Sequence, residues 1–85
     1  MYTVYVLYSD KFNRTYTGFT NNLERRVKEH NSGQSRSTKA FMPWRIVHKE
    51  VYETRQEARE REKYLKSGIG RDFIKQKIRP RSSTE

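Results

Sequence analysis

An arginine and a histidine, side chains that bind anions and transfer protons, lie on the apolar side of one predicted helix. The helix should run from Asn22 to about Asn31, because Asn21 and Glu24 have the spacing of a capping box and Gly33 is a stop signal. At about 100° per residue, one stripe of this helix contains Leu23, Arg26, Val27 and His30. Arg25 points away from the stripe, so Arg26 is the inward-facing arginine.

A glutamate has a comparable position on a second predicted helix. Thr54 and Glu57 form another capping box, which opens a helix that should continue to about Lys66 and end at Gly68. The spacing i, i+4, i+7 on this helix is occupied by Ala58, Glu62 and Leu65. Glu62 therefore lies within a thin apolar stripe, unlike the other acidic residues nearby.

Two tyrosines belong to a predicted β-hairpin. Residues 2–8 and 15–20 are rich in β-branched and aromatic residues, and a polar segment suited to a turn separates them. Because side chains alternate along a strand, Tyr5 and Tyr16 share a face if Tyr8 pairs with Thr15 or Asn13. A register slipped by one residue would separate the two tyrosines.

The predicted elements follow the order strand, strand, helix, strand, helix, helix. Residues 32–43 should form a flexible basic loop, residues 44–52 a third strand, and residues 71–78 a last helix. The fold class is α+β, a small three-stranded antiparallel sheet flanked by helices (β-β-α-β-α-α). We expect one domain over residues 1–78 and a disordered basic tail over residues 79–85. A core shared by sheet and helices would bring the three polar helix residues close to the two tyrosines.

The charge of the chain favours a polyanionic partner. Nineteen Lys and Arg against ten Asp and Glu give a formal net charge of +9 in 85 residues. Nucleic acid is the leading candidate, and a membrane surface is weaker because no apolar run approaches the roughly 20 residues that span a bilayer. A cytoplasmic protein is expected. Without cysteine, any metal ion must be bound by oxygen or imidazole ligands.

Two short motifs resemble the paired motifs of the GIY-YIG nuclease superfamily. They are Thr3-Val4-Tyr5 and Tyr16-Thr17-Gly18, and the remaining residues of the pattern are matched by Leu23, Arg26, His30 and Glu62. The resemblance covers about residues 2–66, and Phe73-Ile74 is similar to the short stand-alone bacterial members. The superfamily includes the incision nuclease of bacterial nucleotide-excision repair and phage homing endonucleases.

The resemblance implies a metal-dependent DNA endonuclease, structure-specific in DNA repair or processing. In its catalytic set, Glu62 would hold Mg²⁺ or Mn²⁺ and Arg26 would pair with a phosphate oxygen. Tyr5 would be the general base, provided that Arg26 and the metal ion lower its pKa from about 10. Tyr16 and His30 would position the water or Tyr5, and which tyrosine takes the proton stays open.

Six residues are candidate nucleic-acid contacts: Gly18, Arg36, Lys39, Lys66, Arg71 and Lys75. Gly18 would leave room for substrate beside Tyr5, and the basic residues would bind phosphates without sequence preference. A solvated basic surface is an equally good interpretation of those charges. Trp44, at the start of the third strand, is expected in the core rather than stacked on a base.

Two alternatives keep the fold and change the function. Several catalytic relatives carry a late asparagine, whereas this chain has none after Asn31, which would suit a non-catalytic nucleic-acid-binding module. An RNA-directed nuclease shares every feature of the DNA nuclease. The first motif has Thr3 in place of glycine and the second has Thr17 in place of isoleucine, but both tyrosines are present. Targeting by a partner protein or by nucleic-acid shape, and the oligomeric state, stay open.

Overall fold

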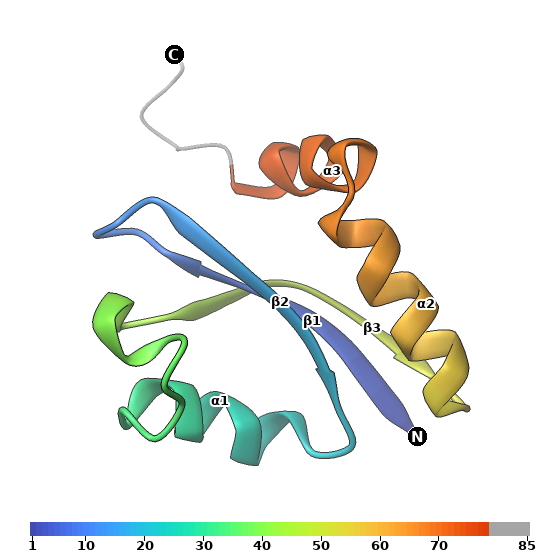
Figure 1. Cartoon of the computed structure of the whole chain (residues 1–85), viewed down its shortest axis with the longest axis horizontal. Helices are drawn as coiled ribbons and strands as arrows, with labels where there is room; N and C mark the ends of the chain where they lie inside the picture. The colour runs from blue at the N-terminus through green and yellow to red at the C-terminus, as the bar shows by residue number, and fades with distance from the viewer. Residues whose placement is uncertain (79–85) are drawn as a thin grey trace.

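The computed structural model describes residues 1–78 and has the predicted α+β fold (Figure 1). The elements are β1 (Tyr2–Ser9), β2 (Arg14–Thr20), α1 (Leu23–Asn31), the 3₁₀ helix η1 (Lys39–Phe41), β3 (Arg45–Tyr52), α2 (Arg55–Lys66) and α3 (Gly68–Ile78). The sheet is antiparallel with the order β2-β1-β3. The predicted tail, residues 79–85, lies outside the described residues.

The hairpin has one of the two registers that bring the tyrosines together. Tyr8 pairs with Thr15, and in the same ladder Tyr5 pairs with Gly18 and Tyr16 with Leu7. Tyr5 and Tyr16 therefore point to the same face of the sheet, as this register predicted.

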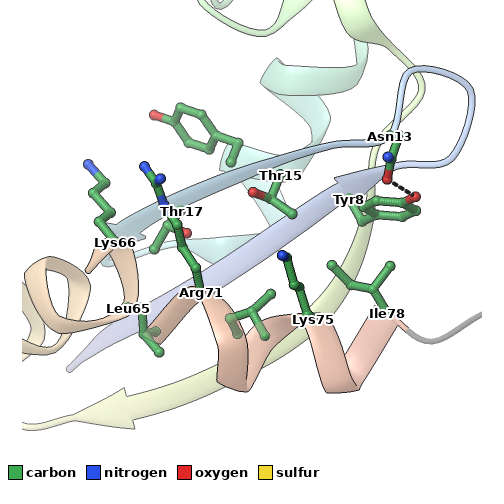
Figure 2. A pocket seen from close by; sticks show the side chains of 11 residues that line it. Tyr8, Asn13, Thr15, Thr17, Leu65, Lys66, Arg71, Lys75 and Ile78 are labelled. Carbon is green, nitrogen blue, oxygen red and sulfur yellow. Dashed lines mark hydrogen bonds between the residues drawn. The ribbon is translucent and has the colours of Figure 1, made fainter. Parts of the chain in front are cut away.

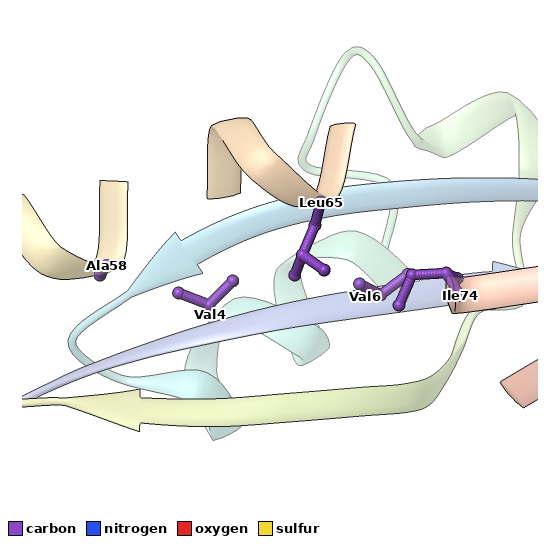
Figure 3. Close-up of a cluster of buried hydrophobic side chains, with 5 residues drawn as sticks. All are labelled: Val4, Val6, Ala58, Leu65 and Ile74. Atoms are coloured by element: carbon purple, nitrogen blue, oxygen red, sulfur yellow. The ribbon is translucent and has the colours of Figure 1, made fainter. Parts of the chain in front are cut away.

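The central strand β1 is buried on both faces. On one face Val4 and Val6 pack against residues of α2 and α3 (Figure 3), a cluster completed by Ala58, Leu65 and Ile74. On the opposite face Tyr5 and Leu7 pack with Trp44, which is buried as expected. Helix α1 covers this second face through Leu23 and Val27, so α1 and the pair α2 and α3 lie on opposite sides of the sheet (Figure 1).

Helix starts agree with the sequence in one case and differ in another. The capping box of Thr54 and Glu57 at the start of α2 is confirmed. The predicted capping box of Asn21 and Glu24 is wrong, because the N-cap is Asn22, whose side chain accepts a hydrogen bond from the Arg25 N–H at 3.1 Å. Strand β2 ends at Thr20 as expected, and α1 begins at Leu23, one residue later than expected.

A charged cluster joins β3 to α2 beside Glu62. The Glu50 carboxylate accepts hydrogen bonds from Arg61 at 2.8 and 3.1 Å, from His48 at 2.6 Å, and from Tyr52. Burial alone would raise the pKa of Glu50, but the hydrogen bonds from Arg61, Tyr52 and His48 outweigh it and lower the pKa to about 2. Because Arg61 precedes Glu62, this cluster fixes the part of α2 that carries the candidate metal ligand.

Helix α3 begins at Gly68, three residues before the predicted start at Arg71. Helix α2 ends at Lys66 as predicted, but Gly68 does not separate the two helices, because Gly68 and Gly70 both belong to α3. At Gly70 a Cβ would collide with the carbonyl oxygen of Tyr64 and lie 2.5 Å from Leu65 Cα. Gly70 therefore permits α3 to pack directly on the end of α2. None of the helices within residues 1–78 is long and apolar enough to cross a membrane.

Gly70→Ala should destabilise the fold by about 1–3 kcal/mol, because the added methyl group has to displace backbone rather than a mobile side chain. Gly68→Ala is the matched control, since nothing lies within 4 Å of a Cβ at that position. It should change the free energy of unfolding by no more than about 0.5 kcal/mol. Urea unfolding followed by circular dichroism measures both variants. Equal free energies of unfolding would contradict the close packing at Gly70.

Candidate active site

Helix α1 presents Arg26 and His30 to the sheet, as its spacing predicts. The Arg26 side chain is 32% exposed and that of Arg25 is 62% exposed, so the choice of Arg26 as the inward-facing arginine is confirmed. His30 is fully buried one turn further along. Both residues lie on the side of α1 that faces Tyr5 and Tyr16.

A chain of hydrogen bonds runs from β1 to the loop after α1. The Tyr5 hydroxyl lies 3.0 Å from His30 Nε2, and His30 Nδ1 lies 2.8 Å from the Thr38 hydroxyl oxygen. The Thr38 hydroxyl donates its proton to the Ser35 carbonyl oxygen, so it accepts the hydrogen bond from His30 Nδ1–H. Nε2 of the neutral imidazole is then the acceptor, and Tyr5 donates to it.

The pKa values of the two central groups shift in opposite directions. Burial, assisted by the positive charge of Arg26, lowers the pKa of His30, which keeps the imidazole neutral. Burial, assisted by Tyr16, raises the pKa of Tyr5 to about 12, and Arg26 offsets this only in part. Arg26 thus acts in the expected direction, but desolvation is the larger effect in the protein alone. A lowering of the Tyr5 pKa by Arg26 together with a metal ion stays a prediction.

Tyr16 is the more accessible of the two tyrosines. It is half-buried, whereas Tyr5 is 1% exposed. Its ring centroid lies 4.7 Å from that of His30 and 6.3 Å from that of Tyr5. The two phenols and the imidazole thus form one aromatic cluster, and Tyr16 is its member nearest to solvent.

Gly18 makes room for Tyr5 rather than for substrate. A Cβ at Gly18 would lie 2.9 Å from the Tyr5 hydroxyl oxygen and 3.2 Å from a ring carbon of Tyr16. The two rings already fill the space that the missing side chain leaves. The space that was expected for substrate beside Tyr5 is therefore taken by the aromatic cluster, and a contact of Gly18 with nucleic acid stays a prediction.

Arg26 has an acidic partner that the sequence did not reveal. Its guanidinium donates to the Glu29 carboxylate at 2.7 Å, and Glu29 also lies 3.8 Å from Arg25. The i, i+3 spacing within α1 was the only available signal for this pair. Arg26 can therefore meet a phosphate only by sharing or leaving Glu29.

Glu62 lies at the edge of the same cluster. Its side chain is 18% exposed, and its negative charge helps to raise the pKa of Tyr5, which places the carboxylate within electrostatic range of that phenol. Lys66 forms an ion pair with it at 3.2 Å. A half-exposed cation such as Lys66 can be displaced, so the carboxylate fits a magnesium site in which waters and phosphate provide the other ligands. Within residues 1–78 no group of three or more His, Asp or Glu residues could hold a metal ion.

The loop after α1 is anchored, which differs from the flexible loop that was expected. Thr38 is fully buried, its carbonyl oxygen accepts a hydrogen bond from Trp44 Nε1–H at 2.9 Å, and η1 follows directly. Arg36 and Lys39 flank Thr38 and are exposed. Thr38 could not be identified from the sequence, because a lone threonine in a polar loop carries no periodic signal.

The other predicted phosphate contacts lie elsewhere on the molecule. Lys66, Arg71 and Lys75 line a groove between β2 and the two C-terminal helices (Figure 2). Tyr16 also lines this groove, so the groove adjoins the aromatic cluster.

Thr38→Val should weaken the ordering of His30, because valine keeps the volume and removes the acceptor of Nδ1–H. We expect the neutral imidazole to populate both tautomers, and the fold to lose about 1–3 kcal/mol. Long-range ¹H–¹⁵N NMR of the imidazole detects the tautomer directly. Thr38→Ser should restore the single tautomer, and Ser37→Ala, at an exposed position of the same loop, should leave it unchanged. A single unchanged tautomer in Thr38→Val would contradict the assigned hydrogen-bond chain.

Comparisons with known proteins identify the family of the chain. Residues 1–75 match the family model described as the GIY-YIG catalytic domain. A UPF0213 protein of Clostridium perfringens is 44% identical over 64 residues, a match that covers 74% of this chain and 68% of that protein. A UPF0213 protein of Haloquadratum walsbyi is 45% identical over 53 residues, which are 61% of this chain and 60% of that protein.

A solved structure supports the fold. The solution NMR structure of the UPF0213 protein BH0048 from Bacillus halodurans is similar with a TM-score of 0.52 and 31% sequence identity. The similarity covers 87% of this chain and 82% of that one. With the family match over residues 1–75, these relatives show that the chain belongs to the GIY-YIG family, a family of nucleases.

Proposed function

We propose that this protein hydrolyses phosphodiester bonds of DNA as a divalent-metal-dependent endonuclease. The observation that carries the proposal is the hydrogen bond from Tyr5 to a neutral, buried His30, with Arg26 and Glu62 in electrostatic range of the phenol. These groups supply a proton acceptor, a phosphate partner and a metal ligand in one place.

A phenol with a raised pKa is a poor general base by itself, and the hydrogen bond to His30 gives Tyr5 a group that can accept its proton. A water molecule that attacks phosphorus gives its proton to the Tyr5 hydroxyl oxygen, while Tyr5 passes its own proton to His30 Nε2. The tyrosine stays neutral throughout, so no phenolate has to form in a buried position. The new bond joins the water oxygen to phosphorus, the bond to the leaving oxygen breaks, and that oxygen takes a proton from solvent.

Arg26 and Glu62 act on the phosphate. Arg26 turns from Glu29 to a non-bridging phosphate oxygen, where its guanidinium stabilises the charge that develops in the transition state. Glu62 would hold the divalent cation in place of Lys66, and the bound cation would supply further charge stabilisation. Tyr16, the more accessible phenol, positions the attacking water or the phosphate by a hydrogen bond.

A non-catalytic nucleic-acid-binding module is the second candidate. The ion pair of Glu62 with Lys66 and the lack of any asparagine after Asn31 favour it. This module would bind nucleic acid without regard to metal and with a strong dependence on salt. An RNA-directed nuclease uses the same groups, so only parallel DNA and RNA substrates separate it from the DNA enzyme.

A cleavage screen with Glu62→Gln tests the proposal. Branched, flapped, supercoiled and single-stranded DNA, with matching RNA, should include a substrate that the wild type cuts in Mg²⁺ or Mn²⁺ and not in EDTA. Glu62→Gln should lose about 100-fold or more of the rate, because it removes the metal ligand. Glu60→Gln, at an exposed position of the same helix, should stay within about twofold. Equal cleavage rates for the two variants would refute Glu62 as the metal ligand. Binding without cleavage of any substrate would leave the binding module as the function.

The pH dependence of cleavage tests the proton path. If Tyr5 had to ionise by itself, the rate would rise with pH toward its pKa of about 12. With His30 as the acceptor, the rate should instead be level through the neutral and mildly alkaline range. It should fall in acid, below the ordinary pKa of histidine, because His30 has a lowered pKa and cannot accept a proton once it is charged.

The two histidines of the chain provide the control for this profile. His30→Asn should lose most of the cleavage rate and should no longer show a range of pH in which the rate is constant. His48→Asn, in the Glu50 cluster, should keep the shape of the wild-type profile. Tyr5→Phe keeps its ring in the core and should be impaired to the same degree as His30→Asn. A wild-type rate that climbs steadily with pH would overturn the proton path.

A further inference from the structure

The groove between β2 and α3 has the composition of a binding site. It has a volume of about 640 Å³, within the range of about 300–1,000 Å³ that is typical of ligand sites. Figure 2 shows Lys66, Arg71 and Lys75 reaching from α2 and α3 toward β2, where Thr15 and Thr17 carry hydroxyl groups. The groove therefore has a basic side and a hydroxyl side.

The charged residues that line the groove are all basic. None of the residues that line the groove is acidic. Within residues 1–78, Arg71 and Lys75 form no ion pair, and both are exposed. They are four residues apart on α3 and so lie on the same side of the helix, where they can bind neighbouring phosphates of one strand.

The floor of the groove is apolar. Leu65 and Ile74 lie beneath it and are almost completely buried. The apolar surface that a ligand can reach belongs to Ile78 and the Tyr16 ring, which are half-buried. A base pair in a duplex keeps its flat faces stacked on its neighbours, whereas an unpaired base has a free face for an apolar surface. A basic side above an apolar floor thus suits an unpaired strand better than a duplex.

The groove is continuous with the candidate active site. Tyr16 belongs to both, and Lys66 of the groove forms the ion pair with Glu62 at 3.2 Å. We infer that this groove binds an unpaired polynucleotide strand, and that the candidate active site cuts that strand close to the point where it leaves a duplex. The nature of the ligand rests on the proposed function, but its binding is measurable without cleavage.

Binding of labelled oligonucleotides in EDTA, measured by fluorescence anisotropy, tests the groove. The variant Arg71→Ala/Lys75→Ala should bind single strands of DNA or RNA at least about 10-fold more weakly than the wild type. It should also lower the slope of log K against log salt by about 1.4, or about 0.7 for each lost phosphate contact. Duplex of the same length should lose no more than about threefold.

Lys49→Ala/Lys77→Ala is the matched control. It also removes two exposed charges, one of them from α3, but Lys49 belongs to β3 and Lys77 packs over Phe73, away from the groove. Its loss of affinity should be similar for single strand and duplex and no more than about threefold. Equal losses of single-strand affinity in the two double variants would overturn the inference.

Two competitors test what the groove recognises. A strand of abasic residues should compete less well than a normal strand, because it has phosphates and no bases for the apolar floor. Polyglutamate of the same charge should compete poorly. If either one competes as well as a normal strand, the groove is only a polyanion surface and the inference fails.

The outcomes separate this inference from the proposed function. Strand binding that depends on Arg71 and Lys75, without cleavage of any substrate, would support the groove and refute the nuclease. Cleavage of flapped DNA that is unchanged in Arg71→Ala/Lys75→Ala would support the nuclease and refute the groove.

Discussion

The arrangement of this molecule depends on the burial of β1 on both faces. A three-stranded sheet has a single central strand, and its alternating side chains need cover on both sides. Val4 and Val6 are covered by α2 and α3, and Leu7 is covered by Trp44 and α1. Tyr5 lies between these residues in the sequence, so a candidate catalytic group is also a core residue. The fold and the chemistry therefore constrain the same strand.

Each charged group of the candidate site has an opposite partner in the free protein. Arg26 is paired with Glu29, and Glu62 is paired with Lys66. The two central groups, Tyr5 and His30, are kept neutral by burial. The site is thus nearly electroneutral at neutral pH although the whole chain is strongly basic. A phosphate and a cation would exchange partners with existing ion pairs instead of entering a field of uncompensated charge.

Features with a local period could be predicted from the sequence. Strand alternation limited the hairpin to a few registers, and helical spacing selected Arg26 over Arg25 and identified Glu62. Features that depend on contacts between distant segments could not. The buried contact of Thr38 with His30 has no periodic pattern, and the pKa of Tyr5 depends on burial that the sequence does not quantify. The start of α3 was missed because Gly68 suggests a helix end, and the contact of Gly70 with Leu65 that packs α3 on α2 has no local pattern.

Gly18 and Tyr5 also depend on each other for their packing. They come from the two motifs that characterise the family, thirteen positions apart, and the phenol of one fills the volume that the other leaves empty. A larger residue at Gly18 would require a smaller ring at position 5, and loss of that ring would leave a cavity beside the glycine. During sequence divergence neither position can change by itself without cost. The two motifs therefore form a single steric unit, divided between adjacent strands.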